Sequence, residues 1–124
     1  MRVPVLKQSQ NLIATTQAAL TDADWLQLQT DLAEMVGKFR THGVLVDVTS
    51  LDVMDSFATR TLRSIASIVK LRGADTVIVG IQPEVAFAMV QLGLTLEDVE
   101  TALDLEQGLV VLRRRHLKGQ HDGR

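Results

Sequence analysis

The stretch that decides the fold runs from Gly43 to Arg60 and reads GVLVDVTSLDVMDSFATR. Its first six residues, Gly43–Val48, are nearly all apolar and rich in β-branched side chains, which is typical of a strand covered on both faces. The residues that follow Ser56 show helical periodicity over about sixteen positions. A serine flanked by acids therefore lies where a strand leads into a helix. The carboxyl ends of strands are where α/β proteins usually form their sites.

The residues before this stretch predict a hairpin and a helix. Val3–Lys7 and Asn11–Thr16 are short β-like runs separated only by Gln8–Gln10, as in a hairpin. Thr21 predicts a helix N-cap, because acids follow it at the positive end of the helix dipole. Apolar residues then recur at helical spacing to about Arg40. They predict one buried face, made of Trp25, Leu28, Leu32, Met35 or Val36, and Phe39.

The residues after Ser56 continue the alternation of helices and strands. A helical stripe ends at Gly73, a residue that suits a left-handed cap; the stripe consists of Ala58, Leu62, Ile65 and Val69. Thr76–Ile81 predicts a buried strand, and Pro83 predicts the start of a helix that reaches about Leu92. A further β-like run covers Val99–Leu103. Asp104–Gln107 predicts the capped start of a last helix, which extends to about Leu117 and uses Gly108 for close approach to the sheet.

The predicted order is β-β-α-β-α-β-α-β-α, which indicates an α/β protein. We expect a mixed sheet of about five strands with about four helices packed on it. A chain of 124 residues fits one domain. We assign residues 1–118 to that domain and residues 119–124 to a disordered basic tail.

Composition excludes several classes of function. The chain has no cysteine, which excludes disulfides and thiol catalysis and suits a reducing cytoplasm. Neither a signal peptide nor an apolar run near the ~20 residues of a membrane span is present, so we expect a cytoplasmic protein. The net charge is −2 and only four aromatic residues occur, which does not suit a nucleic-acid binder.

Patterns that indicate an enzyme are missing from the sequence. His42, His116 and His121 are scattered, and the glycines match no nucleotide-binding loop. The basic segment Arg113–Lys118 suits the negative end of a helix dipole better than a nucleic-acid surface. Three acids near one strand end, Asp47, Asp52 and Asp55, leave two interpretations open. They either bind Mg²⁺ or have the ordinary roles of strand-end, turn and helix-start residues.

Ser56 also has two interpretations from its position alone. Serine is a common N-cap, so the residue can simply begin the helix. Alternatively it is a switch: a phosphate adds about −1.5 to −2 charges there. The helix dipole attracts that charge while Asp52 and Asp55 repel it, so the fold should change little. A partner docked over the serine would meet an unpaired charge, which costs on the order of 2–5 kcal/mol.

The length, the element order and the Asp55-Ser56 pair at the start of a helix resemble a STAS domain, the fold of anti-sigma-factor antagonists. Asp47–Ser50 with Met54–Phe57, then Gly80–Ala86, then Glu100–Leu109 resemble the RsbS-type proteins, the small STAS-only scaffolds of the bacterial stressosome. Antagonists that bind anti-sigma kinases directly tend to have Asp-Ser-Ser-Gly where this chain has Asp55–Ala58. That difference favours the stressosome branch.

The resemblance implies a scaffold and not an enzyme, with no cofactor, metal, nucleic acid or membrane. Such proteins co-assemble with RsbR-type sensor paralogues into a large particle that holds an RsbT-type serine kinase. The kinase phosphorylates the STAS domains and leaves, and an RsbX-type phosphatase resets the system. By position, Ser56 is the phosphoacceptor, and Asp55, Phe57 and Thr59 are expected to contact the kinase. The alternatives are a free antagonist that acts by partner switching and a small-ligand-binding α/β domain.

Overall fold

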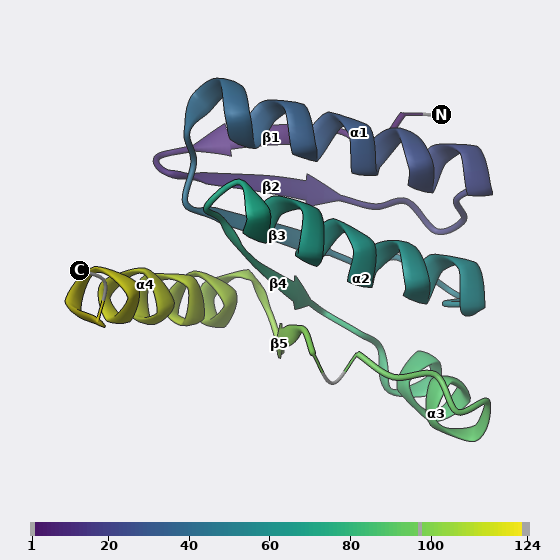
Figure 1. Cartoon of the computed structure of the whole chain (residues 1–124). Helices are drawn as coiled ribbons and strands as arrows, with labels where there is room; N and C mark the ends of the chain where they lie inside the picture. Colours follow the sequence, from purple (N-terminus) through teal and green to yellow (C-terminus); the bar gives the residue numbers. More distant parts are fainter. Residues whose placement is uncertain (1, 97, 123–124) are drawn as a thin grey trace.

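The computed structural model describes residues 2–96 and 98–122, and within them five strands and four helices alternate in the predicted order (Figure 1). The elements are β1 (Val5–Gln8), β2 (Asn11–Thr15), α1 (Asp22–Phe39), β3 (Gly43–Asp47), α2 (Ser56–Leu71), β4 (Asp75–Val79), α3 (Pro83–Gln91), β5 (Glu100–Ala102) and α4 (Leu105–Asp122). The predicted α/β class and mixed sheet are confirmed. The strands begin and end within two residues of their predicted limits.

The strands lie in the sheet in the same order as in the chain, β1-β2-β3-β4-β5. β1 and β2 form an antiparallel hairpin, and each later strand pairs parallel to the one before it. A helix joins each parallel pair, and such crossovers are almost always right-handed. Because all three crossovers step in the same direction along the sheet, α1, α2 and α3 belong on one face. α4 makes no crossover and is free to cover the other face.

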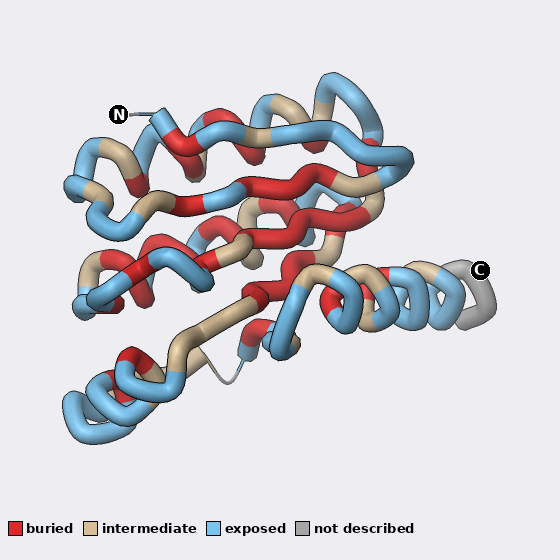
Figure 2. Tube along the Cα trace, turned by 180° about the vertical axis from the view of Figure 1, so that it is seen from behind, coloured by how far each residue is buried: buried red, intermediate tan, exposed pale blue. Residues whose placement is uncertain are grey.

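Two apolar cores, one on each face of the sheet, agree with this arrangement. The larger core contains Trp25 of α1, Leu62 of α2 and Met89 of α3. The smaller core contains Leu112 of α4, packed over Leu45 in the centre of the sheet. Figure 2, seen from behind, shows the buried central strands and the exposed outer surface of α4. The sheet is therefore fixed from both sides, and the ends of its parallel strands meet at one edge.

α1 begins with the predicted cap and buries most of the predicted face. Thr21 and Asp24 form a reciprocal capping box, and the helix ends where Arg40 takes a left-handed conformation. Trp25, Leu28, Leu32 and Val36 are buried. The prediction for Phe39 is wrong: its side chain is 38% exposed, beneath the Lys38 ammonium. Phe39 lies on the predicted side of the helix, but in the last turn, where the chain already leaves the core.

The start and the buried face of α2 set the direction of the residues around Ser56. All four residues of the predicted stripe, Ala58, Leu62, Ile65 and Val69, are buried. Gly73 has the predicted left-handed backbone, with φ of 91°, and lets the chain turn into β4.

None of the helices in residues 2–96 and 98–122 is long and apolar enough to cross a membrane.

α4 confirms the predicted close contact at Gly108 but not the predicted helix end. A Cβ atom on Gly108 would lie 2.6 Å from Leu45 Cδ2 and 2.7 Å from Val79 Cγ1, so the helix backbone rests on the sheet. The helix continues past Leu117 to Asp122, because the residues around Lys118 favour helix and a single glycine does not end it. The tail predicted at residues 119–124 is thus helical as far as Asp122. Residues 123 and 124 lie outside the described part of the chain.

Candidate functional site

Ser56 is the first residue of α2 and is exposed at the carboxyl edge of the sheet. The residue before it, Asp55, is the N-cap: its Oδ1 accepts a hydrogen bond from the amide of Ala58 at 2.8 Å. The interpretation of Ser56 as the cap is therefore wrong. Within the described residues the Ser56 hydroxyl has no hydrogen-bond partner. It is a free hydroxyl on a fixed backbone.

The neighbours of Ser56 differ in how far they can reach a partner. Asp55 is exposed, and Phe57 is half-buried against the larger core. Thr59 is only 2% exposed, and its hydroxyl donates to the carbonyl oxygen of Asp55 at 2.9 Å. A buried, satisfied hydroxyl is not placed to touch another protein. The structure therefore does not support the expected kinase contact of Thr59, which instead secures the first turn of α2.

The loop between β3 and α2, residues 48–55, is anchored although it contains no regular structure. Leu51 and Met54 are 2% and 4% exposed and pack into the larger core. The amide of Asp52 donates to the carbonyl oxygen of Ala18, in the loop before α1, at 3.2 Å. These contacts hold the loop against the domain. They determine the direction in which Ser56 faces solvent.

Asp47 and Thr49 connect the start of this loop to the turn between β4 and α3. Asp47 Oδ1 accepts hydrogen bonds from the Thr49 amide at 2.9 Å and from the Thr49 hydroxyl at 2.5 Å. The Gln82 side-chain amide, which precedes α3, donates to the carbonyl oxygen of Thr49. The turn also contains Gly80, with φ of 81°. The sequence pattern gave no signal for the contact between Gln82 and Thr49.

The acid cluster does not assemble into a metal site. The Asp47 carboxylate already accepts hydrogen bonds from Thr49, and the Asp55 carboxylate accepts one from the amide of Ala58. Asp52 is exposed and contributes its backbone to the loop contact. No group of three or more histidine, cysteine or acidic side chains in residues 2–96 and 98–122 could hold a metal ion. The interpretation of these acids as ordinary structural residues accounts for two of the three carboxylates.

Two of the three histidines meet, although they are far apart in the sequence. His42 precedes β3 and His116 is on α4, and their rings stack with centroids 4.0 Å apart and planes inclined by 12°. Burial lowers the pKa of His42 below its ordinary value, and the charge of His116 lowers it further. The side chain of His121 lies outside the described residues. The pair helps to fix α4 on the sheet and is remote from Ser56 in the chain.

Exposed apolar side chains occur on α3 and in the loop before Ser56. Phe87 and Val90, three residues apart on α3, are 72% and 76% exposed, and we call them the α3 face. Val53, in the loop just before Ser56, is also exposed, at 68%. Figure 1 shows α3 and the start of α2 at the same end of the molecule. The opposite side of α3 is buried through Val85 and Met89. The sequence pattern predicted the helix but not which of its sides would be exposed.

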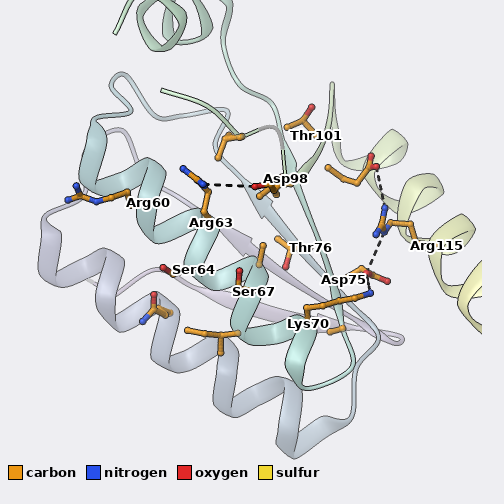
Figure 3. Close-up of a pocket in the computed structure, with 17 residues that line it drawn as sticks. Arg60, Arg63, Ser64, Ser67, Lys70, Asp75, Thr76, Asp98, Thr101 and Arg115 are labelled. Carbon is orange, nitrogen blue, oxygen red and sulfur yellow. Dashed lines mark hydrogen bonds and ion pairs between the residues drawn. The ribbon is translucent and has the colours of Figure 1, made fainter. Parts of the chain in front are cut away.

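A groove of about 1160 Å³ lies between α2, β5 and α4 (Figure 3). Its charges are mostly paired: Lys70 contacts Asp75 at 2.8 Å, and Arg115 contacts both Asp75, at 3.4 Å, and Glu100, at 3.3 Å. Arg115, from the basic segment at residues 113–118, therefore links α4 to β4 and β5. These ion pairs leave little net charge in the groove for selecting a ligand.

Residues 2–108 match the family model described as the STAS domain. The chain belongs to the STAS family. The match spans the sheet, the Ser56 loop and the first turn of α4. The resemblance inferred from the sequence is confirmed at the level of the family.

This STAS domain is similar to proteins of known structure and to curated relatives. A serine-to-glutamate variant of RsbS from Moorella thermoacetica is 31% identical, with a TM-score of 0.79 over 94% of this chain and 98% of that one. A chain in a structure of the stressosome, described as a signal integration and transduction hub, is 32% identical, with a TM-score of 0.76 over 91% of this chain and 98% of that one.

The RsbT co-antagonist protein RsbRA of Bacillus subtilis (strain 168) is 27% identical over 110 residues. That alignment covers 88% of this chain but 40% of the relative. The chain thus spans less than half of the length of that curated relative. It spans nearly all of the two solved chains.

Proposed function

We propose that this STAS domain is a non-catalytic scaffold of a cytoplasmic stressosome, switched by phosphorylation of Ser56. In this proposal it associates with RsbR-type STAS proteins and holds an RsbT-type serine kinase. The kinase transfers a phosphoryl group from ATP to the Ser56 hydroxyl, and an RsbX-type phosphatase removes it. Similarity over nearly the whole length to RsbS and to a stressosome chain supports the scaffold role.

One observation carries the choice of residue: Asp55 caps α2, and the Ser56 hydroxyl next to it is exposed and unbonded within the described residues. A capping serine would lose its hydrogen bond on modification, and the helix would lose stability. Ser56 has no such bond to lose. A phosphate there therefore changes the charge of the surface and leaves the helix start intact.

The α3 face supports a contact that such a charge can break. Phe87 and Val90 are exposed on α3, and Val53 is exposed in the loop just before Ser56. A partner that covers this area also removes water from the serine. A doubly charged phosphate in that interface would lack a counter-charge, and an unpaired interfacial charge costs on the order of 2–5 kcal/mol. Phosphorylation would thereby weaken kinase binding by a factor of about 30 or more.

Co-expression with an RsbR-type protein tests the scaffold role. We expect size-exclusion chromatography and electron microscopy to reveal a particle of many subunits. A mixture that contains only small species would contradict the proposal.

Phosphate labelling tests the residue. With a purified RsbT-type kinase, the Ser56→Ala variant should incorporate no phosphate. Ser64→Ala, which removes an exposed serine from the same helix, should be labelled like the unaltered chain. Full labelling of Ser56→Ala would show that another hydroxyl is the acceptor.

Ser56→Asp should bind the kinase more weakly, and unchanged affinity would contradict the electrostatic argument.

A further inference from the structure

We propose that Gln82 is a positioning residue for Ser56. Its side chain ties the loop that presents the serine to the turn between β4 and α3, so that the kinase meets the serine in one defined place. This inference rests on the proposed phosphorylation of Ser56. It adds a residue that lies in a different βα unit and has no chemistry of its own in the transfer.

The contact is built around Thr49, which is held from two sides. On one side Asp47, at the end of β3, accepts hydrogen bonds from both the amide and the hydroxyl of Thr49. On the other side the Gln82 side-chain amide donates to the carbonyl oxygen of Thr49. Thr49 is exposed and has no apolar anchor of its own. Its position therefore depends on these polar contacts.

The backbone of the β4–α3 turn is shaped to allow this contact. A Cβ atom on Gly80 would collide with the Thr49 hydroxyl and would lie 3.1 Å from its Cβ and 3.2 Å from its Cα. Gly80 also has φ of 81°, a conformation that other residues rarely adopt. The turn thus runs directly against Thr49, and Gln82 is placed two residues later to reach its carbonyl group.

The loop transmits the position of Thr49 to Ser56. Leu51 follows Thr49 by two residues, and its amide donates to the carbonyl oxygen of Val48 at 3.0 Å in a tight turn. Asp52 is then fixed to Ala18, and Asp55 caps α2. Between Thr49 and the cap the chain is thus held at successive points. Loss of the Gln82 contact frees Thr49, the first of these points. The segment of the loop that can move then becomes longer.

A looser loop makes Ser56 a poorer substrate, because binding must then order the chain as well as recognise it. A single hydrogen bond of this kind changes an equilibrium by about fivefold. We therefore expect kcat/KM for phosphorylation of Ser56 to fall by about that factor when the Gln82 donor is removed. The change should lie mainly in KM, because the transfer step itself uses no atom of Gln82.

The decisive variant is Gln82→Glu, which keeps the shape of the side chain but replaces its N–H donor with an acceptor. Gln91→Glu is the matched control, since it makes the same substitution at the exposed end of α3. Gln82→Lys restores a donor and should recover part of the rate. The two measurements are phosphorylation kinetics with a purified RsbT-type kinase and amide hydrogen exchange of residues 48–55 without the kinase.

We expect Gln82→Glu, but not Gln91→Glu, to raise KM about fivefold and to speed exchange in residues 48–55. Unchanged KM in Gln82→Glu, with or without faster exchange, would overturn the positioning role while leaving Ser56 as the acceptor. Failure of the unaltered chain to gain phosphate on Ser56 would instead refute the proposed function. The two failures are therefore distinguishable.

Discussion

Asp55 and Ser56 are adjacent, yet only Asp55 has a structural role at the start of α2. The carboxylate of Asp55 accepts the Ala58 amide at 2.8 Å, whereas the Ser56 hydroxyl points into solvent and bonds to none of the described residues. In the proposed function, helix stability and signalling therefore depend on two different side chains. A modified serine does not compete with the cap.

This division predicts unequal effects of two alanine substitutions on the free energy of unfolding. Asp55→Ala should lower the free energy of unfolding by about 1 kcal/mol, because it removes an N-cap. Ser56→Ala should change it by less than about 0.5 kcal/mol, as an exposed position without contacts should. Urea denaturation measures both. Equal losses for the two variants would contradict the assignment of the cap.

The α3 face predicts a variant that loses partner binding without losing stability. Phe87 is 72% exposed, so Phe87→Ser should leave the urea midpoint nearly unchanged. Exposed aromatic side chains are frequent anchors of interfaces. We therefore expect the Kd for the RsbT-type kinase to rise by roughly tenfold or more. Leu71→Ser is the control, because Leu71 is 89% exposed at the other end of α2. Equal binding by both variants would remove the α3 face from the interface.

Two glycines of α4 should respond to alanine in opposite directions. Alanine favours a helix by about 1 kcal/mol over glycine. At Gly108 the added Cβ meets Leu45 and Val79 at 2.6 and 2.7 Å, and overpacking costs about 1–3 kcal/mol. Gly108→Ala should therefore destabilise the domain by up to about 2 kcal/mol. Gly119→Ala has no neighbour within 4 Å and should be neutral or stabilising. A stabilised Gly108→Ala would contradict the close packing.

The histidine pair predicts a loss of stability in mild acid. The folded pKa of His42 is lowered, so between that value and the ordinary value near 6.5 the unfolded chain binds the extra proton. The contribution of His42 is fully present above about pH 6.5 and is lost as the pH falls through this window. Thermal unfolding at about pH 7.5 and 5.5 should show a smaller drop in Tm for His42→Gln than for the unaltered chain. An equal drop would contradict the assignment to His42.

Most of the fold follows from short-range patterns in the sequence. The alternation of β-branched runs with helical stripes is local, so Gly43–Asp47 and the stripe from Ala58 to Val69 lie where the periodicity indicates. Gly73 and Pro83 mark element ends through their own backbone preferences. Two predictions were wrong for local reasons. Phe39 was expected to be buried, but it lies in the last turn of α1, where the chain leaves the core. The end of α4 was expected near Leu117, but no residue there ends a helix.

Short-range patterns predict less of the candidate site than of the fold. Aspartate and serine are both good N-caps, and a shift of one residue decides which of them remains free. The contact of Gln82 with Thr49 and the stack of His42 on His116 join distant segments. Such contacts depend on strand register and on which face a helix covers. Neither polarity nor spacing along the chain encodes them.

The match between strand order and chain order has a consequence for synthesis. The β1–β2 hairpin needs only the first residues of the chain, and each later strand joins the free edge left by its predecessor. No strand has to wait for a later one before it can pair. A chain that emerges from the ribosome N-terminus first can therefore add one βα unit at a time. The loop that presents Ser56 can be held by Gln82 only after β4 and the turn that follows it have emerged. The proposed phosphate acceptor therefore reaches its place while α3, β5 and α4 are still to be added.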